Sequence, residues 1–431
     1  MQTGQSTYGF EASAVYAQKL DREDPLARFR RRFRIPEEKG VEQTYFLGNS
    51  LGLQPLAVRE RIDAILDQWA HHGVEAFFRA DPSWMELHDR MTPTLSRIVG
   101  CKPSEVTVMN QLTVNLHLLL AGFYRPEGKR KKILCEAKAF PSDQYMMASQ
   151  ARLHGLDPSE AIVEVGPREG EHCIRLEDIL HAIDRHADEI ALVLWGGVNY
   201  YTGQTFDMAA IAEAARKAGA RVGFDLAHAA GNIPLALHDW GVDFAAWCHY
   251  KYLNGGPGAV AGAFIHERHH RDKDMVRLNG WWGNEPSSRF RMEKEHRPYE
   301  SAEAWQVSTP SPILNASLLA SLELFEDAGW EEVLKKAKKL NAWLRFLIDR
   351  LESELPGKAF ECITPRNASG CQASLLTGPR GRETFERLGS EGFFTDWREP
   401  NVIRIAPVPL YNSYTEVWRF YETAKSVIAS Q

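Results

Sequence analysis

The sequence predicts an α/β protein with a large, mostly parallel sheet covered by helices and a smaller C-terminal α+β domain. Between about residues 105 and 270, short apolar runs alternate with amphipathic helical segments, the pattern of a parallel sheet with helices on both faces. After about residue 310, long helical segments dominate and only two short strands are expected. The chain has 431 residues, of which 44% are hydrophobic, so it can bury a large core without disulfide bonds.

The strands of the large domain are predicted from runs of apolar and β-branched residues that end in polar or glycine-rich turns. The run at 190–195 is continuously apolar, which is typical of a strand covered on both faces. We expect strands at 105–109, 132–135, 190–195, 221–225, 244–248 and 258–265. Helices are expected at 113–123 and at 208–218, where Gly219 ends the helical spacing.

The C-terminal part is predicted to hold helices at 317–328, 330–355 and 412–430 and short strands at 372–376 and 401–406. We therefore divide the chain into three ranges: 1–60, a helical arm with part of the small domain; 61–310, the large domain; and 311–431, the small domain. The basic run at 28–34 is interpreted as a solvated helix face with two buried phenylalanines; the alternative is a surface for an acidic partner or nucleic acid.

Composition and charge exclude several classes of protein. Lys plus Arg is 51 and Asp plus Glu is 57, and the net charge of −6 gives no support to a nucleic-acid or anionic-membrane binder. Six cysteines without a CxxC pair argue against a zinc ribbon, a dithiol redox motif or a disulfide framework. There is no apolar segment of signal-peptide type and no apolar run long enough to span a bilayer. We expect a soluble, cytoplasmic protein.

Polar residues that directly follow apolar strands are informative, because ligands of open α/β sheets bind at the carboxyl ends of the strands. Asp225 ends one such strand, and His228 lies three residues further on; the alternative role for Asp225 is a helix N-cap. Lys251 follows the next strand and leads into the turn Gly255-Gly256-Pro257-Gly258, where the backbone can approach a ligand closely. The alternative for Lys251 is a surface lysine before a turn.

A third place is the segment 110–115, between a strand and a helix, where Thr113 and the first backbone amides could hold a phosphate or simply cap the helix. Together, a lysine, a carboxylate and a phosphate site match pyridoxal phosphate, which needs an amine for its aldehyde and a carboxylate for its pyridine nitrogen. Phe140 is a candidate for stacking on the ring. The common nucleotide-binding and serine-hydrolase motifs are absent from the sequence.

Over nearly its whole length the sequence is similar to the kynureninases, a family of pyridoxal-phosphate enzymes in the class-V aminotransferase group of fold-type I. The similarity is carried by the segments 45–53 (YFLGNSLGL), 111–117 (QLTVNLH), 140–143 (FPSD), 201–203 (YTG), 223–228 (GFDLAH), 243–254 (DFAAWCHYKYLN) and 401–412 (NVIRIAPVPLYN). The resemblance implies a role in tryptophan catabolism and NAD biosynthesis, through hydrolysis of L-kynurenine, and of its 3-hydroxy form as an open alternative, to anthranilate or 3-hydroxyanthranilate and L-alanine. It also implies a homodimer with a shared active site.

By the same resemblance, Lys251 forms the covalent bond to the cofactor and moves the substrate α-proton, and Asp225 pairs with the pyridine nitrogen. Tyr250 binds the phosphate and relays protons, and Arg404 clamps the substrate carboxylate. The remaining cofactor residues implied by the resemblance are Leu112 and Thr113 at the phosphate, Phe140 over the ring, Asp143 and His228 beside it, and Trp281 and Thr309, which reach the phosphate from the other subunit.

The sequence departs from some relatives at three places. Gly196 stands where a family serine lies near the cofactor, Thr309 stands where some members have Asn, and Ala76-Phe77 lacks a histidine of animal members. These changes leave the choice between kynurenine and 3-hydroxykynurenine open.

Other classes of protein fit the sequence less well. A cysteine desulfurase would need a reactive thiol, for which Cys362 and Cys371 are the only late candidates. An aminotransferase shares the fold, and a non-catalytic relative would have lost the lysine or its carboxylate. A metal hydrolase could use His266, His269 and His270, but their spacing lacks HExxH, and we expect no metal.

Overall fold

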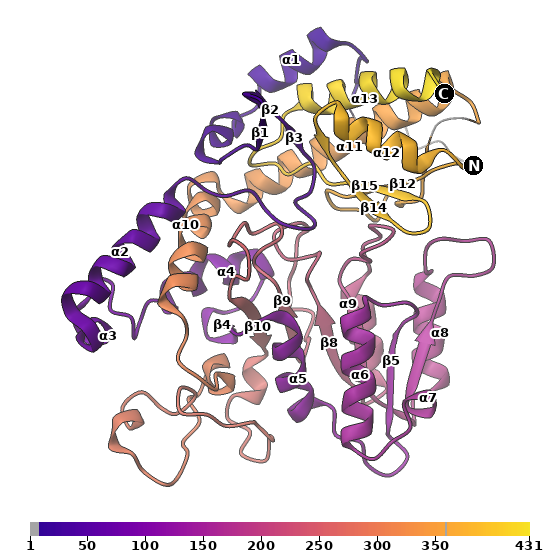
Figure 1. The fold of residues 1–431 in the computed structure, drawn as a ribbon. Coiled ribbons are helices and arrows are strands. Elements are labelled where there is room, and N and C mark those ends of the chain that lie inside the picture. Colours follow the sequence, from indigo (N-terminus) through magenta and orange to yellow (C-terminus); the bar gives the residue numbers. More distant parts are fainter. Residues whose placement is uncertain (1–7, 358–359) are drawn as a thin grey trace. The chain divides into compact units, whose positions relative to one another are not determined.

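The computed structural model describes residues 8–357 and 360–431 (Figure 1). The chain forms two compact units, one made of 1–57, 200–205 and 323–431 and the other of 58–199 and 206–322. The predicted division into 1–60, 61–310 and 311–431 stays a prediction. Among the described residues, no helix is both long and apolar enough to cross a membrane. The cytoplasmic location expected from the sequence also stays a prediction.

The larger unit is built on a seven-stranded sheet with the order β4-β10-β9-β8-β7-β5-β6 (Figure 1). The strands are β4 (Val106–Met109), β5 (Lys132–Glu136), β6 (Ile162–Val165), β7 (Ile190–Gly196), β8 (Arg221–Asp225), β9 (Phe244–Trp247) and β10 (Ala261–Ile265). Only β10 runs antiparallel to its neighbours β4 and β9, and the other pairs are parallel. The predicted mostly parallel sheet is therefore confirmed, and six strands direct their carboxyl ends to one edge.

Helices pack on this sheet through apolar side chains. The helices of the larger unit are α2 (Ala57–His72), α3 (Ala76–Arg79), α4 (Thr92–Val99), α5 (Leu112–Phe123), α6 (Pro141–Leu153), α7 (Pro158–Ala161), α8 (Leu176–Arg185), α9 (Met208–Lys217) and α10 (Pro312–Ala328), whose last turns belong to the smaller unit. Helix α5 packs on β9 and β10 and against α6, while α8 packs on β6 and against α9. A core cluster that includes Leu116, Leu120, Phe123, Leu192 and Phe244 fills the space under α5.

Two glycines fix the packing between β8, β9 and β10. Gly223 is the register partner of Phe244, and a Cβ on this glycine would lie 2.1 Å from the phenylalanine ring. Gly262 faces Trp247 in the same way, with 2.2 Å from a built Cβ to the indole. Since no side chain fits at either position without a shift of its neighbour, the two glycines make room for the aromatic rings on the neighbouring strand.

The smaller unit has its own core. Its four-stranded antiparallel sheet has the order β11-β12-β15-β14, and its helix α13 packs against α1, α11 and α12. Its helices are α1 (Ala14–Arg22), α11 (Trp330–Glu354), α12 (Gly381–Ser390) and α13 (Tyr414–Ala429), and its strands are β1 (Glu37–Glu38), β2 (Val41–Glu42), β3 (Thr44–Tyr45), β11 (Glu361–Cys362), β12 (Ala373–Leu376), β13 (Phe393–Phe394), β14 (Asp396–Arg398) and β15 (Val402–Ile405). An α+β unit was expected here.

The basic run at 28–34 lies in a short 3-10 helix, Ala27–Arg32, and the segment after it. Phe29 and Phe33 are buried, as the solvated-face interpretation required. Arg30 forms ion pairs with Glu42 and Glu416, both at 2.9 Å. These contacts account for the run as part of the smaller unit's own packing.

Candidate active site

Lys251 lies in the loop that follows β9, at the edge where the six strands end. Its Nζ atom is 2.9 Å from Nε2 of His228, which comes from the turn after β8. Lys251 is half-buried, so the surface-lysine alternative is not supported. His228 is 8% exposed. The two residues come from the segments that follow two neighbouring parallel strands.

The loop that carries Lys251 is anchored by α10. Ser317 donates a hydrogen bond to the Gly255 carbonyl oxygen at 2.8 Å, and Ser321 donates to the Leu253 carbonyl oxygen at 2.7 Å. Gly256 has a φ of 93°, which favours glycine over residues with a Cβ. The predicted glycine-rich turn therefore serves to hold the lysine loop in place.

Asp225 and Asp143 form a carboxyl pair at the same edge. Asp225 ends β8, and its Oδ1 accepts a hydrogen bond from the Ala227 amide at 2.7 Å, so it caps a turn rather than a helix. Asp143 lies in the first turn of α6, and its carboxyl group is in hydrogen-bonding contact with that of Asp225. Burial, and then the charge of Asp225, raise the pKa of Asp143 well above its usual range.

One oxygen of this carboxyl pair lacks a hydrogen-bond partner. Oδ1 of Asp143 is buried without a hydrogen-bond partner. Lys251 is the only cation among the groups that act most strongly on Asp143, and it ranks behind burial and the two acids Asp225 and Glu136. A buried acid with an unpaired oxygen is costly for the fold, which marks the place as a site for a cationic ligand group.

Tyr250 precedes Lys251 and is half-buried. Its hydroxyl group is in hydrogen-bonding contact with the Cys248 thiol. Burial raises the pKa of Tyr250 far above its usual value of 10, and the neighbouring Cys248 and Asp225 act in the same direction. The phenol is therefore neutral at physiological pH and is able to donate its proton.

The predicted phosphate residues lie at the start of α5. Leu112 is the first residue of this helix and Thr113 the second, and both are half-buried. The N-cap residue, Gln111, makes no side-chain capping bond. The first-turn N–H groups of α5 are therefore suited to bind an anion.

Phe140 immediately precedes α6 and is 44% exposed. Its carbonyl oxygen accepts a hydrogen bond from the Asp143 amide at 2.9 Å, so the aromatic ring and the acid are held by one turn. An exposed aromatic face beside a buried acid fits a planar ring with a protonated nitrogen.

The contacts described above for Lys251, Asp225 and their neighbours do not include Trp281 or Thr309. The Trp281 indole is 42% exposed and donates a hydrogen bond to the Arg289 carbonyl oxygen at 3.0 Å. Thr309 is exposed. Their assignment to the phosphate of a partner subunit stays a prediction.

Arg404 lies on β15 of the smaller unit and is 1% exposed. Its Nη2 forms an ion pair with Asp396 at 2.6 Å, and its Nη1 donates to the Tyr200 carbonyl oxygen at 2.6 Å. These contacts fix the plane of the guanidinium group. The role of Arg404 as the carboxylate clamp also stays a prediction.

Sequence reasoning missed Glu136, the last residue of β5. Its side chain is 5% exposed and accepts a hydrogen bond from the Asn199 amide at 3.0 Å. Burial, and next the charge of Asp225, raise the pKa of Glu136 to about 7, against the opposing hydrogen bond from Asn199. The signal was present, because Glu136 directly follows the apolar strand at 132–135, by the same rule that found Asp225.

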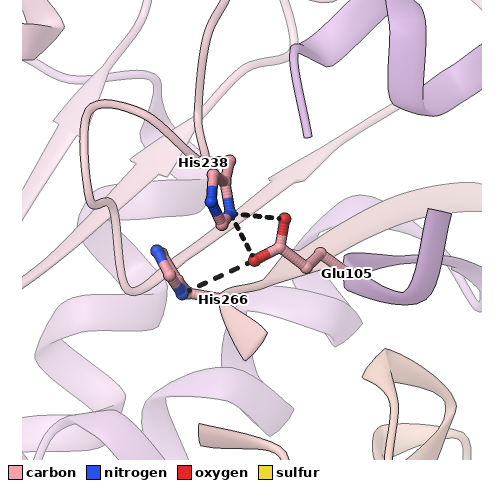
Figure 2. Close-up of side chains that lie close together, drawn as sticks. All are labelled: Glu105, His238 and His266. Atoms are coloured by element: carbon pink, nitrogen blue, oxygen red, sulfur yellow. Dashed lines mark hydrogen bonds and ion pairs between the residues drawn. The ribbon is translucent and has the colours of Figure 1, made fainter. Parts of the chain in front are cut away.

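The opposite edge of the sheet holds a second polar cluster (Figure 2). The fully buried Glu105 accepts hydrogen bonds from His238 Nδ1 at 2.9 and 3.0 Å and from the Lys102 and Glu267 amides at 2.9 and 2.8 Å. His266 lies with its Nδ1 3.5 Å from Oε1 of Glu105. The carboxylate oxygens are thus already occupied by donors of the protein, as in a structural network.

The histidines of the HERHH run point to three different partners. His266 faces Glu105, His269 Nε2 lies 2.7 Å from Asp243 Oδ1, and His270 Nε2 lies 2.9 Å from the Ile265 carbonyl oxygen. The metal-hydrolase alternative needed the three to converge, and their separate partners argue against it.

Comparisons with known proteins agree with this geometry. The aminotransferase class-V family matches residues 45–366, and the kynureninase C-terminal domain family matches residues 333–423. The fold is similar to that of the cystine C-S lyase C-DES in complex with its reaction product, with a TM-score of 0.74, 19% identity and coverage of 89% of this chain and 97% of the lyase. It is also similar to a cysteine desulfurase from Thermococcus onnurineus, with a TM-score of 0.73, 20% identity and coverage of 90% and 95%. The chain has the fold-type I architecture of the class-V aminotransferase group.

Closer relatives are named kynureninase. The chain is 52% identical over 422 residues to that of Flavobacterium psychrophilum, covering 97% of this chain and 99% of the relative. It is 50% identical to that of Christiangramia forsetii, with coverage of 98% and 100%, and 49% identical to that of Myxococcus xanthus, with coverage of 96% and 97%. The chain belongs to the kynureninase family, which confirms the resemblance found in the sequence.

The desulfurase alternative is not supported by these relatives or by the thiols. Cys371 is buried, and burial raises the pKa of its thiol to about 12. Burial also raises the pKa of Cys362. Neither thiol has the thiolate character that a nucleophilic cysteine needs.

Proposed function

We propose that the residues around Lys251 perform the reaction of the kynureninase family, the hydrolysis of L-kynurenine to anthranilate and L-alanine. The cofactor is pyridoxal 5′-phosphate and the substrate is kynurenine. The observation that supports the residue assignment most strongly is the combination of a lysine amine, 2.9 Å from His228, with the contacting carboxyl groups of Asp225 and the buried Asp143, whose Oδ1 lacks a hydrogen-bond partner.

The described residues fit this cofactor. Asp143 and Asp225 supply negative charge for a protonated ring nitrogen, the uncapped start of α5 supplies donors for the phosphate, and Phe140 supplies an exposed aromatic face. When bound, pyridoxal phosphate supplies an electron-accepting ring that stabilises negative charge on substrate carbon atoms.

Each side chain then has a task. The Lys251 amine takes the proton from the substrate α-carbon and returns protons where the bond breaks. Asp225 keeps the ring nitrogen protonated, which keeps the ring electron-poor. Tyr250, neutral because its pKa is raised, donates a hydrogen bond and relays a proton. Arg404, whose plane is fixed by Asp396, binds the substrate carboxylate through paired N–H donors.

The test is a measurement of anthranilate fluorescence after mixing the purified protein and pyridoxal phosphate with L-kynurenine. We expect the wild type to release anthranilate and Lys251→Ala to release none above background. Lys102→Ala is the matched control, because Lys102 is an exposed lysine paired with Glu267 near the opposite edge of the sheet. A wild type that binds cofactor but releases no anthranilate would reject the substrate, and an active Lys251→Ala variant would reject the lysine assignment.

We also propose a homodimer in which Trp281 and Thr309 serve the partner's site; their exposure in the single chain supports this assignment. Mixing inactive Lys251→Ala with inactive Trp281→Ala subunits should restore activity, since a hybrid dimer holds one intact shared site. A monomer in analytical ultracentrifugation, or no restoration in a dimer that exchanges subunits, would contradict the shared site.

A further inference from the structure

Glu136 reaches toward Asp225 across a strand that lies between them. The two acids end β5 and β8, and β7 separates these strands in the sheet. The last residue of β7 is Gly196, which is the register partner of Asp225. A side chain at position 196 on this face would stand between the two carboxyl groups.

Gly196 leaves that space open, and Glu136 fills it. A Cβ built on Gly196 would lie 2.7 Å from Oε1 of Glu136, closer than real Cβ contacts come. The other oxygen, Oε2, is held by the Asn199 amide at 3.0 Å. The glycine therefore determines where the Glu136 carboxyl group lies, and Asn199 fixes its orientation.

Among the described residues, the charged group that acts most strongly on Glu136 is an acid. The group that acts on it most strongly after burial and Asn199 is Asp225 from β8. Glu136 in turn acts on Asp143 from α6 and on the neighbouring thiol of Cys135. Lys251 lowers the pKa of Asp143, but it is not among the groups that act on Glu136.

We propose that Glu136 is a positioning residue of the cofactor site: seated over Gly196 and held by Asn199, it completes a three-carboxyl cluster with Asp143 and Asp225 and releases a proton to solvent when the positively charged pyridine ring binds. This inference rests on the proposed function, because the ring nitrogen is the cation that the cluster receives.

Electrostatics gives the reason for the proton release. Two buried carboxyl groups beside the half-buried Asp225 retain protons, because each ionised group disfavours the next. With its pKa raised to about 7, Glu136 is partly protonated in the cofactor-free protein at pH 7. A nearby positive charge favours the ionised form, so cofactor binding expels that proton. Acting through Asp143 and Asp225, Glu136 then adds negative charge that retains the proton on the ring nitrogen.

The experiment is calorimetric titration of pyridoxal 5′-phosphate into cofactor-free, full-length protein at pH 7, in two buffers with different ionisation enthalpies. The difference between the buffers gives the number of protons released, a readout that does not depend on activity. We expect Glu136→Gln, which keeps the shape and the Asn199 contact, to release fewer protons than the wild type, by up to about half a proton. The matched control is Glu164→Gln, on the neighbouring strand β6, where Glu164 is exposed.

Equal proton release by the wild type and Glu136→Gln would overturn the proposal. Gly196→Ala is the second variant: it keeps the carboxyl group but displaces it, so we expect weaker cofactor binding and a shifted pH midpoint of the bound cofactor's visible absorbance. If Glu136→Gln does not fold, wild-type binding and absorbance in Gly196→Ala would overturn the proposal. A wild type that does not bind pyridoxal phosphate would instead reject the proposed function itself.

Discussion

Acidic residues lie at both ends of the strands in the seven-stranded sheet. At one end nearby donors compensate their charge, and at the other end fewer donors do so. At the edge where β4 and β9 begin, Glu105 and Asp243 are buried beside histidines, arginines and backbone amides that donate to them. At the edge where β5 and β8 end, Glu136, Asp143 and Asp225 gather with fewer donors.

The pKa values record this difference. Hydrogen bonds from His269 and Arg268 and the Arg268 charge outweigh burial and lower the pKa of Asp243 to about 2. Burial dominates for Glu136 and raises its pKa to about 7. The acids where β4 and β9 begin are therefore compensated by donors of the described residues, whereas where β5 and β8 end Lys251 is the one cation among the groups that act most strongly on Asp143. The acids where β5 and β8 end lack enough donors to compensate their charge, and this distinguishes the cofactor edge of the sheet from the structural edge where β4 and β9 begin.

The largest effect is expected from Asp225→Ala, which removes the proposed partner of the ring nitrogen. We expect the anthranilate rate to fall by about a thousand-fold or more, equivalent to about 4 kcal/mol, because the ring loses its protonated state. Asp239→Ala is the control, since Asp239 is an exposed aspartate in the loop before β9. A fall of less than about ten-fold in a cofactor-loaded Asp225→Ala variant would show that the cofactor edge does not use this acid.

Glu105→Ala should affect stability and spare the chemistry. It leaves the His238 ring nitrogen and the Lys102 and Glu267 amides without their acceptor. We expect a loss of about 3 kcal/mol in the free energy of unfolding and an unchanged kcat for the folded fraction. Urea unfolding and active-site titration give the two numbers. If activity per folded molecule fell as for Asp225→Ala, the two edges would not be functionally distinct.

The pH dependence of the cofactor-free protein should reveal Glu136. Its pKa is 4.5 in the unfolded chain and about 7 in the folded one, so the folded state binds more protons between these values. Stability from this group is full below pH 4.5 and is lost as the pH rises through 7, by at most about 3 kcal/mol. Glu136→Gln should flatten this part of the stability curve. Identical curves for the two proteins between pH 5 and 8 would contradict the raised pKa.

Ser321→Ala should have the smallest effect. It removes the hydrogen bond to the Leu253 carbonyl oxygen and leaves that acceptor without its anchor on α10. We expect about 1 kcal/mol of destabilisation and a decrease in kcat of a few-fold, because the Lys251 loop loses one of two anchors. Ser353→Ala is the control, because Ser353 is an exposed serine near the end of α11. An unchanged Tm and kcat would show that Ser317 alone fixes the loop.

The sequence was enough to predict the fold class and the strands that flank the site, because apolar runs that end in polar residues or turns, such as the continuous run at 190–195, signal buried parallel strands. Strand β6 was missed because Glu164 interrupts a short, half-exposed edge strand. Helix α6 was missed too, since its mixed sequence has little amphipathic spacing.

Within the site, the sequence predicted Asp225 and Lys251 at the ends of neighbouring strands, whereas the contact of Lys251 with His228 and the contribution of Glu136 were not predicted. That contribution depends on a missing side chain at Gly196, which lies on β7 between the strands of Glu136 and Asp225, and the register of β7 with β8 reveals it. From the sequence, Gly196 was interpreted as the loss of one hydroxyl contact to the cofactor. In the structure, the absence of a side chain at Gly196 leaves the space that the Glu136 carboxyl group occupies.

The most direct test compares Asp143→Asn with Asp243→Asn in the cofactor-free protein at pH 8, by the change in Tm. Asp143→Asn removes an acid whose pKa is raised by burial, so we predict a higher Tm for this variant. Asp243→Asn removes an acid whose pKa is lowered by its donors, so we predict a lower Tm, consistent with a loss of about 2 kcal/mol. A higher Tm for Asp143→Asn together with a lower Tm for Asp243→Asn would support acids at the cofactor edge that lack a compensating cation. Equal decreases in the Tm of both variants would contradict it.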